Sequence, residues 1–288
     1  MTDQAFKLRE LINESSPEKV QVGDARIIAV SSGKGGVGKT NFTVNLGIAL
    51  SKMGKKVTII DADLGLANID ILLGLVPRYT LTHVLKMEKK LSEIIVDGPN
   101  GISIVSGGSG VMDMVNLNQV ELSRLIESLE YLNNESDYIL IDTGAGLNHS
   151  VLSFIQASTE LIVVVTSDPT SITDAYALIK NIGNLEVGVK VVVNRIESNR
   201  EGLDVFQKLN TASSKFLDME LESIGYIYED HNVKKSVKRQ VPFLIGFPNS
   251  LASRGVELVA ENLDRNSQYI PPSGGFSSLI KKIFKNKN

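Results

Sequence analysis

Short apolar runs alternate with longer amphipathic segments over most of the chain. Strands are expected at residues 26–31, 57–60, 102–105, 138–141, 161–166, 190–194 and 223–227. Helices are expected at residues 41–53, 118–132, 170–181, 205–217 and 250–262, the third of them starting at a Ser or Thr cap. Strands that alternate with helices predict an α/β fold with a single doubly wound, mostly parallel sheet.

The segment between the first expected strand and the first expected helix matches the phosphate-binding pattern G-x-x-x-x-G-K-[ST]. Its residues are Gly33, Lys34, Gly35, Gly36, Val37, Gly38, Lys39 and Thr40, and Asn41 follows as a further nucleotide-binding residue. The glycines let backbone N–H groups converge on phosphates, Lys39 neutralises the β/γ oxygens, and the Thr40 hydroxyl ligates Mg²⁺. The helix dipole favours the bound anion. This loop therefore predicts binding of a nucleoside triphosphate.

Carboxylates follow two of the expected strands. Asp61 and Asp63 come after the run at residues 57–60, and Asp142 comes directly after the run at residues 138–141. Ligands of open α/β sheets bind at the carboxyl ends of the strands. We therefore expect these three side chains to lie near the phosphates.

The loop has one lysine more than the general pattern requires, Lys34. With it the loop resembles the deviant Walker A motif of the MinD/ParA class of P-loop ATPases, K-G-G-x-G-K-[ST]. Residues 61–68 resemble the D-x-D-x-G-x-x-N switch I segment of that class, and residues 138–146 its Walker B strand and switch II. The resemblance implies a Mg²⁺-dependent ATPase that binds ATP and ADP and closes into an ATP-dependent homodimer. In that dimer Lys34 would reach the partner's phosphates, as an arginine finger does.

The same resemblance implies a role for each carboxylate. Asp63 would polarise the attacking water, and with Lys34 and Lys39 it makes up the expected catalytic set. Asp61 would support the Mg²⁺ shell, and Asp142 would hold Mg²⁺ through water. With Thr40, these two carboxylates form the expected metal site.

The strand at residues 190–194 ends in Asn194-Arg195, which resembles the strand-end N-R pair that contacts adenine in this class. The lysine and aspartate of the guanine-specific pattern N-K-x-D are both absent here. Residues 225–230, which include Ile227, resemble the adenine-flanking segment G-x-I-P-x-D, with Tyr228 in place of the proline. The sequence therefore favours ATP over GTP.

Composition narrows the function classes. The chain of 288 residues has no cysteine, which excludes disulfides and the cysteine-held clusters of nitrogenase iron proteins and iron–sulfur carrier ATPases. No apolar run approaches the ~18 residues of a transmembrane helix, and residues 1–9 are polar and of mixed charge, unlike a signal peptide. We expect a cytoplasmic protein.

The last thirteen residues have the pattern of an interfacial amphipathic helix. The apolar positions at i, i+3, i+4, i+7 and i+8 are Phe276, Leu279, Ile280, Ile283 and Phe284, and the lysines away from that stripe are Lys281, Lys282 and Lys285. Such a helix binds anionic lipids of the inner membrane leaflet, weakly when single and more firmly when a dimer presents two. The alternative is a helix docked on the protein's own core. MinD-type proteins have a similar tail for reversible, ATP-dependent membrane attachment.

About twenty residues precede the first strand, and they contain the pattern D-Q-A-x-x-L-R. Its positions are Asp3, Gln4, Ala5, Leu8 and Arg9. The pattern resembles the activator helix of the FlhG family, also called YlxH or FleN, which regulates flagellar number and placement. The resemblance implies that this helix stimulates the SRP-type GTPase FlhF, with Gln4 orienting water in the partner's site. It also suggests contact of the surface helix within residues 199–222 with proteins of the flagellar switch complex (the C-ring).

Four regions are expected. They are an activator helix and linker (1–21), a MinD-like ATPase domain (22–262), a Pro/Gly linker (263–275) and the membrane-targeting helix (276–288). Two alternatives keep the same chemistry: a cell-division positioning ATPase of the MinD kind, and a ParA-like partition protein that binds DNA through Lys234, Lys235, Lys238 and Arg239. A net charge of −3 gives no broad basic surface, so DNA is not an expected partner.

Overall fold

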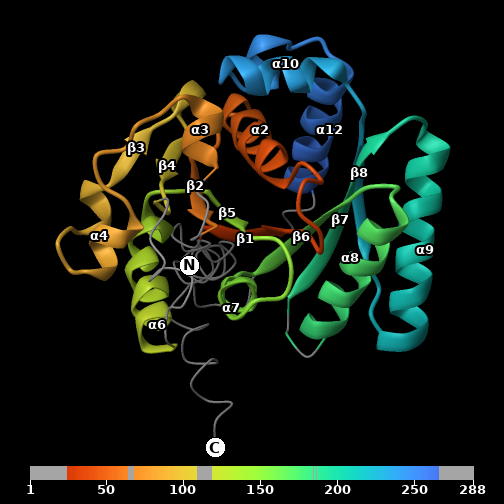
Figure 1. The fold of residues 1–288 in the computed structure, drawn as a ribbon, viewed down its shortest axis with the longest axis horizontal. Helices are drawn as coiled ribbons and strands as arrows, with labels where there is room; N and C mark the ends of the chain where they lie inside the picture. The colour runs from red at the N-terminus through yellow and green to blue at the C-terminus, as the bar shows by residue number, and fades with distance from the viewer. Residues whose placement is uncertain (1–24, 64–67, 109–118, 184, 186, 266–288) are drawn as a thin grey trace, which may run out of the picture.

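Eight strands form one sheet in the computed structural model, in the order β3-β4-β2-β5-β1-β6-β7-β8 (Figure 1). The structure describes residues 25–63, 68–108, 119–183, 185 and 187–265. The strands are β1 (Arg26–Ser31), β2 (Val57–Ala62), β3 (Ile95–Asp97), β4 (Ser103–Val105), β5 (Tyr138–Thr143), β6 (Glu160–Val165), β7 (Gly188–Ile196) and β8 (Glu222–Tyr228). All neighbouring strands are parallel except β3 and β4, which are antiparallel. The predicted fold class is confirmed.

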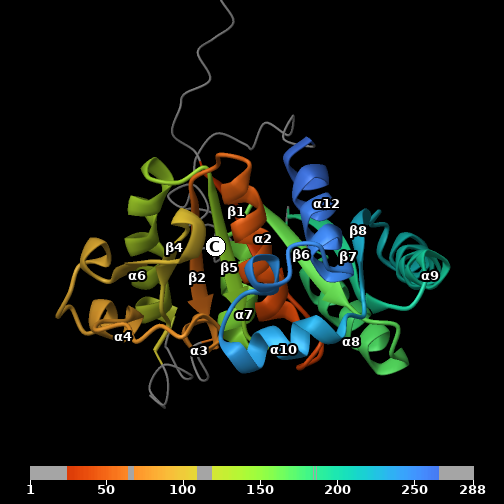
Figure 2. The same ribbon diagram turned by 90° about the horizontal axis from the view of Figure 1, so that it is seen from above.

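Helices cover both faces of the sheet (Figures 1 and 2). One face has α2 (Lys39–Lys52) and α12 (Leu251–Arg265), and the other has α6 (Gln119–Ser128), α7 (His149–Gln156), α8 (Pro169–Ile182) and α9 (Asn199–Leu217). The short helices α3 (Ile69–Leu73) and α11 (Phe243–Gly246) contact α2, and α10 (His231–Arg239) packs against α11. Helix α4 (Leu81–Leu85) lies near β3. Because helices pack on both faces of the sheet, β2, β5 and β6 are buried along their whole length.

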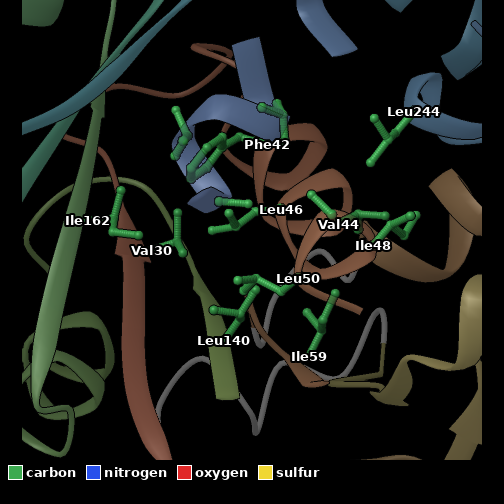
Figure 3. Close-up of a cluster of buried hydrophobic side chains, with 14 of the residues drawn as sticks. Val30, Phe42, Val44, Leu46, Ile48, Leu50, Ile59, Leu140, Ile162 and Leu244 are labelled. Atoms are coloured by element: carbon green, nitrogen blue, oxygen red, sulfur yellow. The ribbon is translucent and has the colours of Figure 1, made fainter. Parts of the chain in front are cut away.

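Helix α2 packs on the sheet through its apolar face. Phe42, Leu46 and Leu50 project from it toward Val30 and Leu140 of the sheet (Figure 3). All five side chains are at most 1 % exposed. Burial of each such side chain contributes about 1.5–3 kcal/mol, so the helix that begins at the phosphate-binding loop is held firmly on the central strands.

Several element boundaries differ from the expected ones. Helix α2 begins at Lys39 rather than residue 41, because Gly38 in the left-handed region ends the loop there. Helix α8 is capped by Asp168, whose carboxylate accepts the Thr170 N–H, and not by Ser or Thr. Helix α9 begins six residues earlier than expected, behind the cap Ser198. The expected helix 118–132 is α6 followed by a 3₁₀ segment, Leu129–Asn134. The elements β3, α3, α4, α7, α10 and α11 were not predicted.

Candidate active site

The loop at residues 33–40 joins β1 to α2 and so lies at the carboxyl end of the central strand (Figure 1). Gly36 and Gly38 have φ angles of 79° and 95°, where a side chain would be strained. No side chain would fit at Gly33, because a Cβ there would lie 2.1 Å from the backbone carbonyl carbon of Asp174 in α8. The first N–H groups of α2 have no helical partner and are available to an anion. This geometry is that of a phosphate-binding loop.

Asp142 is the centre of a buried hydrogen-bond network. Its Oδ1 lies 2.9 Å from Lys39 Nζ and accepts the Thr43 hydroxyl at 3.0 Å, while its Oδ2 accepts the Thr40 hydroxyl at 2.7 Å. Asp142 is fully buried and Lys39 is 8 % exposed. The structure therefore joins the predicted phosphate lysine to two predicted metal ligands, Thr40 and Asp142.

Asp61 lies beside Asp142 on the neighbouring strand, where the two residues are register partners. Its carboxylate accepts the backbone N–H groups of Asp63, Asn68 and Ile69 at 3.2, 2.9 and 3.0 Å. Burial, and then the nearby Asp142 charge, raise the pKa of Asp61 to about 7. The Asp61 oxygens thus bind the backbone of switch I and of the first residue of α3, a structural contact that the sequence did not predict.

A cavity of about 480 Å³ opens above the loop. The predicted residues that line it are Gly35, Gly36, Gly38, Lys39, Thr40, Asn41, Asp63 and Arg195. Its other lining residues are Ser32, Asn68, Ile71, Leu72, Ala145 and Val237. Asp63, the predicted catalytic carboxylate, therefore faces the same space as the phosphate lysine.

Lys34 does not line this cavity. Its Nζ lies 2.8 Å from Asp168 Oδ2 and 2.6 Å from the Thr170 hydroxyl, at the N-terminus of α8. The Lys34 side chain is 41 % exposed, unlike that of Lys39. The two lysines of one loop thus have different surroundings, one buried at the phosphate site and one at the surface.

A smaller cavity of about 60 Å³ shares Gly38, Asn41 and Arg195 with the larger one. The predicted adenine contacts Asn194, Arg195 and Ile227 all line it. The Asn194 amide nitrogen donates to the Val37 carbonyl at 2.8 Å, and its oxygen accepts the Arg195 N–H at 3.0 Å. In this structure the Asn194 side chain therefore links strand β7 to the phosphate loop.

Sequence reasoning missed the part of both cavities that helix α10 supplies. Val233 and Lys234 line the smaller cavity, and Val237 lines the larger one. From the sequence, the basic residues between Lys234 and Arg239 were considered only as the DNA contact of the ParA-like alternative. The available signal was the pair Val233 and Val237, which are four residues apart and so share one face of a helix.

The remaining predicted functional residues lie outside the described ranges. These are the N-terminal set at residues 3–9, the C-terminal set at residues 276–285 and four residues of switch I, 64–67. Among the helices that the structure does describe, none is long and apolar enough to span a bilayer.

A family described as the ParA-type "NUBPL iron-transfer P-loop NTPase" matches residues 24–264. The antiactivator FleN of Pseudomonas aeruginosa is 40 % identical over 90 % of this chain and 93 % of its own length. The flagellum site-determining protein YlxH of Helicobacter pylori is 33 % identical over 99 % of both chains.

A solved structure has the same architecture. The septum site-determining protein MinD of Pyrococcus horikoshii, complexed with Mg-ADP, superposes with a TM-score of 0.73 at 26 % identity, over 87 % of this chain and all of that one. The fold, the phosphate loop and the sequence similarity agree with one another. The chain belongs to the FlhG (FleN/YlxH) family of MinD/ParA-type P-loop ATPases.

Proposed function

We propose that this chain regulates the number and placement of flagella as an ATP-dependent dimer that attaches reversibly to the cytoplasmic face of the cell membrane. The observation that carries the proposal is the similarity to the flagellum site-determining YlxH, which extends over 99 % of both chains. That alignment takes in the two terminal segments, which distinguish this family from a bare ATPase domain.

The reaction is hydrolysis of ATP to ADP and phosphate. The backbone N–H groups of the loop and the Lys39 ammonium bind the phosphates. Asp63 orients and polarises the attacking water in the larger cavity, which it lines together with Lys39. Lys34 of the opposite protomer supplies a further cation to the charge that develops on the transferred phosphoryl group.

The donors at the phosphate site suit Mg²⁺. Thr40 and Asp142 offer a hydroxyl and a carboxylate in contact with each other, and Mg²⁺ prefers few protein oxygens together with phosphates and waters. Within the described residues no group of three or more His, Cys, Asp or Glu side chains is placed to hold a metal ion. Thr40 and Asp142 would hold the ion, which neutralises phosphate charge when bound.

Membrane attachment is assigned to residues 276–288. One amphipathic helix of this length binds a bilayer weakly, and two helices presented by one dimer bind it as a unit. Formation of the ATP dimer would then attach the protein, and hydrolysis would release it.

Residues 3–9 are proposed to stimulate an SRP-type GTPase of the FlhF kind. The test is GTP hydrolysis by the purified GTPase domain, measured with a peptide of residues 1–20. Stimulation is expected, with loss of it in a Gln4→Ala peptide and its retention in a Glu10→Ala control, since Glu10 is outside the D-Q-A-x-x-L-R pattern. No stimulation by the unaltered peptide would favour the division-site alternative, to which the MinD relatives correspond.

Switch-complex proteins remain proposed partners through the surface of α9. That helix leaves Leu203 and Phe216 exposed at 44 % and 67 %.

A further inference from the structure

Helix α10 borders both cavities of the site. Its first half contributes Val233 and Lys234 to the smaller, base-side cavity, and its second half contributes Val237 to the larger, phosphate-side cavity. Its N-cap Asp230 accepts the Ala252 N–H at 3.3 Å, which ties that end to α12. The helix therefore lies along the nucleotide site from the base to the phosphates (Figures 1 and 2).

The other end of α10 is joined by Gln240 to α3, the helix that follows switch I. The Gln240 amide nitrogen donates to the carbonyl oxygen of Ile71 in α3 at 2.9 Å. That carbonyl also accepts the Gly74 N–H, at 3.3 Å, where α3 ends. Gln240 has φ 54° and ψ 38°, a left-handed conformation that favours glycine at the end of a helix. A strained residue thus supplies the contact between the two helices.

Helix α3 is also held at its other end. The Asp61 carboxylate accepts the N–H groups of Asn68 and Ile69, and it accepts the N–H of Asp63 as well. One carboxylate therefore fixes both the catalytic Asp63 and the first turn of α3. Since the same Asp61 carboxylate binds the N–H of Asp63 and the N–H groups at the start of α3, a displacement of α3 would alter the position of Asp63.

We propose that Gln240 is a positioning residue for ATP hydrolysis, which couples α10 at the base-side cavity to α3 and thereby to Asp63. The inference rests on the ATPase activity and not on the flagellar or membrane role. Gln240 acts through α3 and is not a lining residue of either cavity. Loss of its amide would loosen the C-terminal end of α3 and lower the rate of hydrolysis while nucleotide binding is retained.

The test exploits the left-handed backbone of Gln240. In Gln240→Gly the amide is lost but the backbone strain is relieved, so the melting temperature should stay equal or rise. The kcat of the full chain should fall to about one third or less, with KM for ATP within about twofold. Hydrogen exchange of the amides at residues 72–75 should quicken about tenfold, with no change in the central strands.

Two further variants distinguish the effect of the hydrogen bond from that of the size of the side chain. Gln240→Lys keeps a donor and should restore at least about half of the kcat, whereas Gln240→Glu offers only acceptors at neutral pH and should not. Gln207→Ala, on the exposed face of α9, is the matched control and should leave all readouts unchanged. A Gln240→Gly protein with unaltered or raised kcat would overturn the proposal. A lowered kcat accompanied by a lowered melting temperature or lost ATP binding would overturn it equally.

Discussion

Lys34 and Asp168 form an ion pair within one chain, with 2.8 Å between Nζ and Oδ2. The hydrogen bond from Lys34, and then those from Thr170, hold the pKa of Asp168 below its ordinary value, so this carboxyl group is ionised at neutral pH. Both side chains are more than 40 % exposed, so water competes for each of them. A lysine that is to reach a partner's phosphates must leave this contact, and its exposure makes the exchange easy.

Asp168→Asn should therefore favour the ATP dimer. Asparagine caps a helix as well as aspartate does, so α8 should remain intact while the charge that holds Lys34 is removed. At a protein concentration where dimers are sparse, ATP hydrolysis per chain should rise about two- to fivefold, because releasing Lys34 shifts the monomer–dimer equilibrium. Sedimentation velocity with ATP measures the dimer directly, and Asp204→Asn on α9 is the control. An unchanged or smaller dimer fraction would contradict this role of Asp168.

Asp142→Ala should destabilise the nucleotide-free protein by about 3 kcal/mol, because it leaves the buried Lys39 ammonium without its partner. The double variant Lys39→Ala/Asp142→Ala should recover part of that loss, since no charge is then left unpaired. Urea unfolding of the wild type, both single variants and the double variant completes the cycle. Equal stabilities for the wild type and Asp142→Ala would show that the pair is not buried as described.

The raised pKa of Asp61 predicts a pH dependence of stability. Between pH ~4, where the unfolded carboxyl ionises, and pH ~7, the folded protein binds more protons than the unfolded chain. The stability contributed by Asp61 therefore falls as pH rises through this window, with a slope approaching about 1.4 kcal/mol per pH unit, and is constant above it.

Asp61→Asn cannot titrate and isolates this contribution. The free energy of unfolding of the wild type minus that of Asp61→Asn should decrease from pH 4 to pH 7, measured by urea unfolding at each pH. A difference that is flat or that increases with pH would mean that the buried carboxyl stays charged in the folded protein.

Removal of residues 276–288 should abolish ATP-dependent binding to anionic vesicles and leave nucleotide binding intact. A Lys281→Gln/Lys282→Gln/Lys285→Gln variant should lose about 1 kcal/mol per lysine on anionic vesicles and change little on neutral ones. Vesicle flotation with ATP and with ADP measures both effects. If the truncated chain still binds vesicles with ATP, the attachment site lies elsewhere.

The sequence predicted the fold class and the phosphate loop because both depend on local patterns. Buried parallel strands are continuous apolar runs, and the loop from Gly33 to Thr40 has its own spacing. The lining of the cavities by α10 and α3 was not predictable in the same way. Ile71, Val237 and Gln240 are brought together only by the crossing of elements far apart in sequence, and a left-handed Gln240 has no local signature.

Some contacts of the predicted site residues could likewise be foreseen from the sequence, and others could not. The proximity of Lys39, Thr40 and Asp142 follows from adjacent parallel strands, so it was foreseeable from their positions at strand ends. The contacts of Lys34 with the N-terminus of α8 and of Asn194 with the loop were not, because no sequence pattern pairs these side chains with their partners.

Action of Lys34 across the dimer is tested most directly by mixing two inactive variants, Lys34→Ala and Asp63→Ala. In a mixed dimer the Lys34→Ala protomer keeps its own Asp63 and receives Lys34 from the partner, so one of its two sites is complete. Equal mixing makes about half of the dimers mixed, and the ATPase rate per chain should reach about one quarter of the wild-type rate, while each variant alone stays inactive. A mixture no more active than its components would contradict a lysine that acts in trans.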